Sequence, residues 1–155
     1  MKQIIIKVLL CVVSTLSSLT VNAQVKAFEK YADVKDVTYV YISKYMLSMA
    51  GKNAAPSVPG IDIKTLAGKL TGIQIITSED NTAQKKLKSD VKSIMEKDKY
   101  ELMMQMNEED TKVNIFHHID KKLSAVIMQV EEDDEMTVIV FSGKFTLDDV
   151  MKMTQ

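Results

Sequence analysis

The chain has 155 residues, the size of one ordinary domain, and 46% of them are hydrophobic while 26% are charged. This profile is typical of a globular protein and excludes a disordered chain, which has fewer apolar side chains and more net charge. The formal charge is −1 and all 20 basic residues are lysines. This composition argues against nucleic acid as a partner, because arginine is the preferred bidentate ligand of phosphate and guanine.

The N-terminal segment 1–23 has the features of a cleaved signal peptide. Lys2 and Lys7 form a basic start, an apolar stretch follows, and Val21-Asn22-Ala23 supplies small residues for cleavage. Serine and threonine interrupt the apolar stretch, which is shorter than the ~20 residues of a membrane span. We therefore expect cleavage after Ala23, a periplasmic or secreted protein, and no stable membrane anchor.

Cys11 lies within the apolar stretch and follows Leu10, a context that does not fit a lipid-modified cysteine. It is the only cysteine of the chain. After cleavage the chain is expected to have no disulfide, no thiolate nucleophile and no cysteine metal ligand. Residues 24–155 are expected to form a single domain.

The mature chain opens with a predicted helix, a strand and a second helix. Apolar residues recur at helical spacing over 25–32, which predicts a short amphipathic helix. The run 37–42 is dense in β-branched and aromatic residues and apolar on both faces, which favours a strand covered on both sides. Ser43 can cap a short helix over 44–50, and Gly51 would end it.

A loop, a helix and a strand are expected next. Residues 52–60 contain two prolines and a glycine, which is typical of a surface loop. Asp62 can cap a helix that ends at Gly72 and whose apolar stripe includes Leu66 and Leu70. Residues 73–77 then form a predicted second strand.

The clearest helix follows this second strand. Asn81 and Gln84 have the spacing of a capping box, which places the start of the helix there. Four apolar residues lie on one face and are expected to be buried, namely Leu87, Val91, Ile94 and Met95.

From Tyr100 the apolar period changes to two, which predicts a four-strand meander. Leu102, Met104 and Met106 are expected on one face of its first strand. The other three strands lie over 113–119, 123–130 and 136–141, and acidic turns occur at 108–110 and 131–135. Thr146 with Asp149 then opens a closing helix that carries Leu147, Val150 and Met151. The predicted fold is α+β, with an antiparallel sheet of about five to six strands and helices packed on one face.

Four segments carry recognisable strand and helix motifs, namely Phe28-Glu29-Lys30-Tyr31, 37–43 with Lys44 and Met46, 73–79, and Gly143 followed by 145–148. Together they resemble a family of small exported Bacteroidetes proteins catalogued as domain of unknown function 4252. The resemblance covers nearly all of the mature chain and implies export and a single-domain fold. These motifs are strand and helix patterns without reactive groups, so the resemblance assigns no activity and no site residue.

His117, His118 and Asp120 form the most suggestive cluster for a metal or acid–base site. Neighbouring side chains of a strand point to opposite faces, so the two histidines cannot bind one metal ion together. His118 and Asp120 share a face, but the chain has no third histidine. We interpret the cluster as part of a half-exposed strand.

Two further patterns suggest metal ions. The acidic run Glu131–Glu135, with Gln129 before it, could offer oxygen ligands to Ca²⁺, but it lacks the ligand spacing and central glycine of an EF-hand loop. The segment Met103–Met106 could offer thioethers to Cu(I). A solvated hairpin turn and a methionine-filled core account for these two patterns, although a methionine-lined groove for a ligand or partner stays open.

Nothing in the chain has the pattern of a catalytic centre. There is no G-x-S-x-G motif, and Ser43 at its strand-to-helix junction is explained by helix capping. The five glycines are scattered, which excludes a phosphate-binding loop. No catalytic residue, cofactor site or metal site is therefore predicted.

The function predicted from the sequence is that of a non-catalytic exported protein that binds a protein partner in the periplasm or envelope. Tyr39 and Tyr41 on the first strand, with Met46 and Met49 on the following helix, are the candidate contact residues, although an ordinary core would use the same residues. One alternative is a carrier or sensor of a small apolar ligand, held in a pocket of Met, Leu and Ile. A second is a hydrolase that uses His117 or His118 beside a carboxylate. The oligomeric state stays open.

Overall fold

The computed structural model describes residues 26–50, 66 and 68–152. The predicted signal peptide, the predicted loop 52–60 and most of the predicted helix that starts at Asp62 lie outside these residues. The elements are η2 (Lys30–Asp33), β1 (Thr38–Ser43), α3 (Lys44–Ala50), β2 (Leu70–Ser78), α4 (Asn81–Asp98), β3 (Glu101–Asn107), β4 (Thr111–His118), β5 (Ser124–Glu132), β6 (Met136–Gly143) and α5 (Leu147–Met151).

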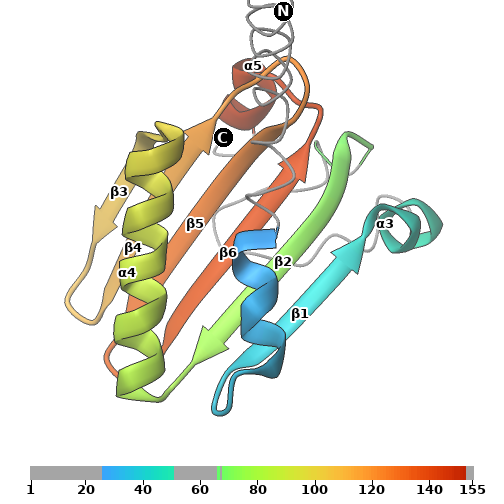
Figure 1. The fold of residues 1–155 in the computed structure, drawn as a ribbon. Coiled ribbons are helices and arrows are strands. Elements are labelled where there is room, and N and C mark those ends of the chain that lie inside the picture. The colour runs from blue at the N-terminus through green and yellow to red at the C-terminus, as the bar shows by residue number, and fades with distance from the viewer. Residues whose placement is uncertain (1–25, 51–65, 67, 153–155) are drawn as a thin grey trace, which may run out of the picture.

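The six strands form one antiparallel sheet in the order β1-β2-β6-β5-β4-β3 (Figure 1). Strands β3 to β6 follow one another as a meander, which confirms the predicted four-strand unit. The last strand of the meander, β6, pairs with β2, so β2 and β6 form the centre of the sheet together with β5. This confirms the α+β fold class and leaves β1 and β3 as the two edges.

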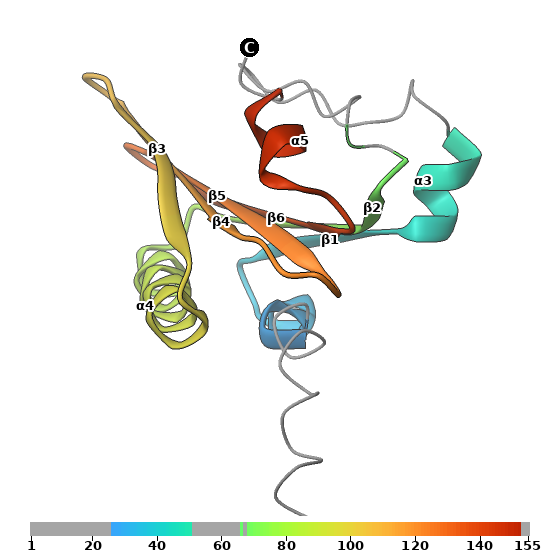
Figure 2. The ribbon, with the colours of Figure 1, turned by 90° about the horizontal axis from the view of Figure 1, so that it is seen from above.

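Helices cover both faces of the sheet. Figure 2 shows α4 and the N-terminal helical segment 26–33 on one face, and α3 and α5 on the other. The sequence predicted that all helices pack on one face of the sheet. This is correct for α4 and the N-terminal segment, but α3 and α5 lie on the opposite face. The physical reason is that β5 and β6 are apolar on both sides: Ile127 and Val140 face α4, whereas Val126 and Phe141 face α5.

The face under α4 forms the first core cluster. Leu87 and Val91 are buried there against the strands, with Ile94 and Met95 partly buried, as the helical pattern predicted. The start of the helix differs from the prediction, because Asp80 is the N-cap and its Oδ1 accepts a hydrogen bond from the backbone N of Ala83 at 2.8 Å.

The N-terminal segment packs beside α4 on the same face. The predicted amphipathic pattern places Phe28 and Tyr31 in the core, where both are fully buried. The Tyr31 hydroxyl donates a hydrogen bond to Asp90 of α4 at 2.6 Å, and the ammonium of Lys30 lies 2.5 Å from the same carboxylate. Partial burial acts to raise the pKa of Asp90, but these two hydrogen bonds and the charge of Lys30 outweigh it and lower the pKa.

The opposite face forms the second core cluster, beneath α5 and α3. Phe141, Phe145 and Val150 are buried there together with Leu47 of α3. The predicted capping box of α5 is confirmed: the Thr146 hydroxyl accepts from the backbone N of Asp149, whose carboxylate accepts from the backbone N of Thr146. Of the three apolar residues predicted to share one side of this helix, Val150 is buried, while Leu147 and Met151 are exposed.

The strand predicted over 37–42 is present as β1, but it is an edge strand with Val40 and Tyr41 exposed, and the prediction that it is covered on both sides was wrong. Two other local predictions were also wrong. Residues 70–72, assigned to the end of a helix, belong to β2, because Leu70 and Gly72 pair with Gly143 and Ser142 of β6. In β3 a bulge between Leu102 and Met104 interrupts the period of two.

The bulge redistributes the apolar side chains of β3. Leu102 pairs with Phe116 whereas Met104 pairs with Ile115, and paired residues share a face, so Leu102 is separated from Met104 and Met106. Strict alternation would place Met103 on the other face from Met104, but Met103 packs against the second core cluster.

Candidate functional site

Strand β1 is an edge of the sheet with an exposed apolar surface. It pairs with β2 in an unbroken antiparallel register from Thr38↔Thr77 to Ser43↔Gly72, and its outer side pairs with no other described strand. The backbone N–H and C=O groups of that outer side are therefore free of sheet partners among the described residues. Such an edge is a template on which a further strand can pair.

The side chains of β1 differ in how far they are buried. Tyr39 packs against the core under α4 and its hydroxyl accepts a hydrogen bond from Gln74 Nε2 at 2.9 Å. Burial is the largest influence on this hydroxyl and raises the pKa of Tyr39. Tyr41 lies over Gly72 of β2, which leaves room for the ring, and Val40 points to the other face. Tyr41 and Val40 are both exposed.

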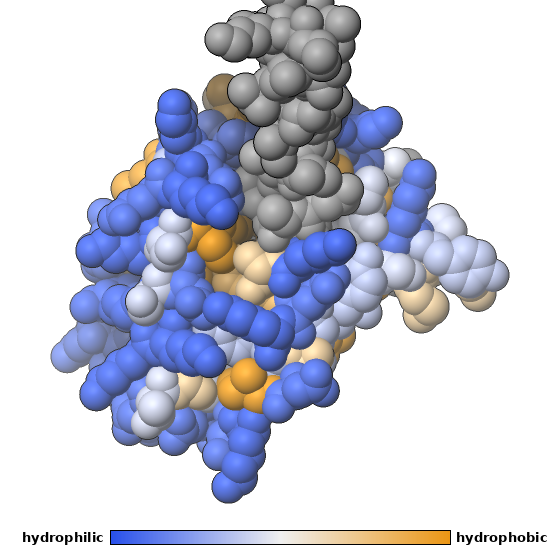
Figure 3. Space-filling model, in the orientation of Figure 1, coloured by the Kyte–Doolittle hydropathy of each residue, from blue (hydrophilic) through white to orange (hydrophobic). Residues whose placement is uncertain are grey.

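Helix α3 continues this surface beyond the end of β1. The Ser43 hydroxyl accepts a hydrogen bond from the backbone N of Met46 at 3.3 Å, which is the predicted helix-capping role. Leu47 anchors α3 in the core, and the other large side chains of the helix are exposed. In Figure 3 this end of the molecule shows pale blue and tan side chains, in contrast to the dark blue over α4.

We name five residues the β1–α3 surface, namely Val40 (41% exposed), Tyr41 (51%), Tyr45 (71%), Met46 (55%) and Met49 (67%). They are half of the ten exposed large hydrophobic side chains among the described residues, and they fall within ten consecutive positions. Of the contact residues predicted from the sequence, the structure exposes Tyr41, Met46 and Met49 and partly buries Tyr39. Val40 and Tyr45 were not among the predicted contact residues. Val40 is exposed because β1 is an edge of the sheet, and Tyr45 is exposed on α3.

The two histidines do not form a site with one another. His117 and His118 lie on opposite faces of β4, as strand alternation predicted. The Nε2 atom of His117 lies 3.9 Å from a carboxylate oxygen of the exposed Glu101, which is too far for a hydrogen bond. His118 packs against the Tyr100 ring with centroids 5.5 Å apart. Asp120 is engaged in its own turn, where Oδ1 accepts from the backbone N of Lys122 at 2.7 Å.

The predicted acidic turns lie side by side, because β4 pairs with β5 and so brings together the ends of two hairpins. Six carboxylates, a threonine and a lysine line an open cavity of about 270 Å³ there. Within the acidic run, Glu131 is already bound by Lys88 of α4 and by Gln129. In the part of the chain that the structure describes, no group of three or more His, Cys, Asp or Glu side chains is placed to hold a metal ion.

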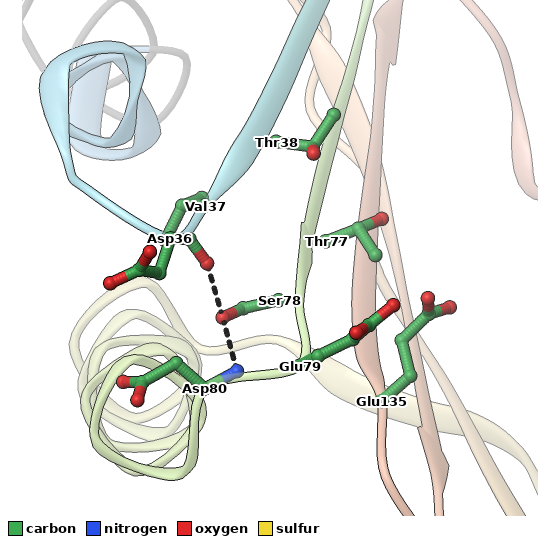
Figure 4. Close-up of a pocket in the computed structure, with 8 residues that line it drawn as sticks. All are labelled: Asp36, Val37, Thr38, Thr77, Ser78, Glu79, Asp80 and Glu135. Atoms are coloured by element: carbon green, nitrogen blue, oxygen red, sulfur yellow. Dashed lines mark hydrogen bonds between the residues drawn. The ribbon is translucent and has the colours of Figure 1, made fainter.

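A cavity of about 600 Å³ lies where β1, β2 and α4 meet (Figure 4). Ser78 links its walls, because its hydroxyl donates to the Asp36 backbone oxygen at 2.8 Å and accepts from the Asp80 backbone N at 3.1 Å. Asp36, Glu79, Asp80 and Glu135 are among the residues that line the cavity. The Asp80 side chain caps α4, so the cavity is organised by turn and capping hydrogen bonds.

These cavities bear on the two alternative functions. The carrier hypothesis requires a pocket of Met, Leu and Ile, whereas the three described cavities are open and lined mainly by polar and charged residues. The hydrolase hypothesis requires a histidine and a carboxylate in a cleft, and neither His117 nor His118 lines any of these cavities. No described helix is long and apolar enough to cross a membrane.

Comparison with known proteins identifies a family for the chain. No curated protein and no solved structure matches the chain significantly. The family model described as "Domain of unknown function (DUF4252)" matches residues 31–153, which include every strand of the sheet and helices α3, α4 and α5. The family suggested by the strand and helix motifs is therefore confirmed, and the chain belongs to the DUF4252 family.

Proposed function

We propose that this protein is exported to the periplasm or envelope and acts there, without catalysis, by binding another protein through the β1–α3 surface. The observation that carries the proposal is the concentration of exposed aromatic, methionine and valine side chains over Val40–Met49, next to an edge strand. Export is inferred from segment 1–23, whose basic start, apolar stretch and small residues before Gln24 are those of a signal peptide.

The chemistry of the β1–α3 surface suits a protein partner. Tyrosine and methionine are enriched in interface cores, and lysine and glutamate are depleted there. Tyr41 and Tyr45 offer large rings with few rotatable bonds, while Met46 and Met49 are flexible and adapt to an irregular surface. Leaving such side chains in water is unfavourable by roughly 25 cal/mol for each Å² of apolar area, which binding a partner would recover.

Paired surface variants test this proposal. The double variant Tyr45→Ser, Met49→Ser removes two of the most exposed residues, and the matched control Leu102→Ser, Met104→Ser removes exposed apolar side chains at the opposite edge. The tagged chain is crosslinked in its source cell, purified and identified by mass spectrometry, with circular dichroism to confirm folding. We expect the first variant, and not the control, to lose the crosslinked protein. Equal recovery from both variants would contradict the proposal.

A further inference from the structure

We infer that the partner bound at the β1–α3 surface is a second copy of this chain, paired through antiparallel β1 strands across a two-fold axis at Val40. The inference rests on the proposed function and identifies its partner. Two copies joined in this way would share one continuous sheet, with the same strand at the centre of both halves.

The two edges of the sheet differ in how they are protected. Strand β3 begins with the charged Glu101 and contains the bulge between Leu102 and Met104, and both features hinder pairing with another chain. Strand β1 has no charged residue among its six and no break in its register. Of the two edges, β1 is therefore the one suited to accept a strand.

The charges that flank β1 favour antiparallel pairing of two copies. Asp36 lies in the turn before β1, with a φ of 60°, and Lys44 is the first residue of α3. When Val40 lies opposite Val40 of the second copy, the end of β1 that carries Asp36 lies beside the end that carries Lys44 in the other copy. Opposite charges therefore meet at both ends of the paired strands.

The same register matches the side chains on both faces. Tyr39 of one copy comes opposite Tyr41 of the other, twice, which gives two aromatic cross-strand pairs on the face of α4. On the face of α3 and α5, Val40 meets its symmetry mate and Ile42 meets Thr38. Aromatic and β-branched pairs of this kind stabilise antiparallel strands.

The first test is site-specific crosslinking of the purified, exported protein. All variants carry Cys11→Ser, which removes the only thiol of the natural chain. A Val40→Cys variant is expected to form a disulfide-linked dimer on mild oxidation, because directly opposed Cβ atoms in antiparallel strands lie within disulfide reach. The matched control Leu102→Cys places a comparably exposed thiol on the other edge and is expected to stay monomeric. Equal crosslinking of the two variants would overturn the inference.

The second test is charge reversal, read as the dimer dissociation constant by analytical ultracentrifugation. Asp36→Lys and Lys44→Asp alone are each expected to weaken the dimer by about tenfold or more, since each converts two attractive pairs into repulsive ones. The combined variant is expected to recover most of the lost affinity. Asp36 has a positive φ of 60°, so thermal melting of each variant must show that the fold is kept.

The results of these experiments distinguish a failure of the inferred dimer from a failure of the proposed function. A wild-type protein that stays monomeric up to millimolar concentration, with no Val40→Cys crosslink, overturns the pairing of two copies. If Tyr45→Ser, Met49→Ser still loses a crosslinked partner in the cell, the proposed function stands with a different protein as its partner. If that variant also keeps every crosslinked protein, both the pairing of two copies and the proposed function are contradicted.

Discussion

Gly143 is the position where we expect a single methyl group to be most costly. It ends β6, pairs with Leu70 on one side and Ser124 on the other, and precedes the turn into α5. A Cβ built on Gly143 would lie 2.9 Å from the Leu70 Cα and 3.0 Å from a ring carbon of Phe145, and closer still to the backbone oxygen of Lys69. That oxygen accepts a hydrogen bond from the backbone N of Lys144 at 2.9 Å.

The cost of Gly143→Ala follows from these contacts. Backbone atoms cannot rotate away, so the strand must shift, and overpacking of this kind costs ~1–3 kcal/mol. Losing the Lys144 hydrogen bond adds about 1 kcal/mol. With a urea m-value of ~1–3 kcal/mol/M, the unfolding midpoint is expected to fall by about 1 M or more.

Two other glycines provide graded controls in the same urea titration. A Cβ at Gly68 meets no atom of the described residues within 4 Å, so Gly68→Ala is expected to change stability by less than about 0.5 kcal/mol. A Cβ at Gly72 meets the Tyr41 ring at 3.0 Å, and this exposed ring can move, so the cost is expected to be intermediate. If Gly143→Ala unfolds at the same urea concentration as Gly68→Ala, the packing described at the end of β6 is incorrect.

Three further variants test other parts of the fold. Leu87→Ala, at a side chain only 1% exposed under the sheet, is expected to lower the free energy of unfolding by ~2–5 kcal/mol, and a loss below about 1 kcal/mol in urea titration would argue against the first core cluster. Tyr31→Phe removes a hydrogen bond to a charged group and is expected to cost ~1.5–3 kcal/mol at neutral pH. Because that bond helps to lower the pKa of Asp90, the deficit should shrink as the pH falls below about 4, and a deficit independent of pH would contradict this role. Hydrogen bonds, first of all from Lys69, lower the pKa of Asp149 to about 2, so Lys69→Met is expected to raise the carboxyl midpoint in a ¹³C NMR titration, and an unchanged midpoint would refute the pairing.

Local sequence patterns correctly predicted the features that depend on a single helix or strand. The buried face of α4 follows from apolar residues at helical spacing, and the capping box of α5 follows from Thr146 and Asp149 three positions apart. Both depend on contacts within a few residues, which the sequence displays directly. The period of two after Tyr100 likewise predicted the meander.

Features that depend on distant pairing could not be predicted. The bulge in β3 becomes visible only when Leu102 and Met104 are aligned with β4. The extension of β2 to Leu70 requires its pairing with Gly143, which lies far along the chain. In both cases a local period was correct only up to the point where a neighbouring strand changed it.

The candidate site, too, was predictable in its residue types but not in its exposure. Tyr41, Met46 and Met49 were recognised from residue type, yet the same pattern would describe a buried strand and helix. The exposure of Tyr41 follows from the position of β1 beside β2 at the end of the sheet, and that strand order is set by the long-range pairing of β2 with β6.

Binding of a protein at the β1–α3 surface is tested most directly by photo-crosslinking in the source cell. A photoreactive phenylalanine derivative replaces Tyr45, the most exposed residue of that surface, and in a control strain it replaces the exposed Lys92 of α4. We predict a discrete crosslinked protein from position 45 and none from position 92. No product from position 45, or the same products from both positions, would contradict a binding role for the β1–α3 surface.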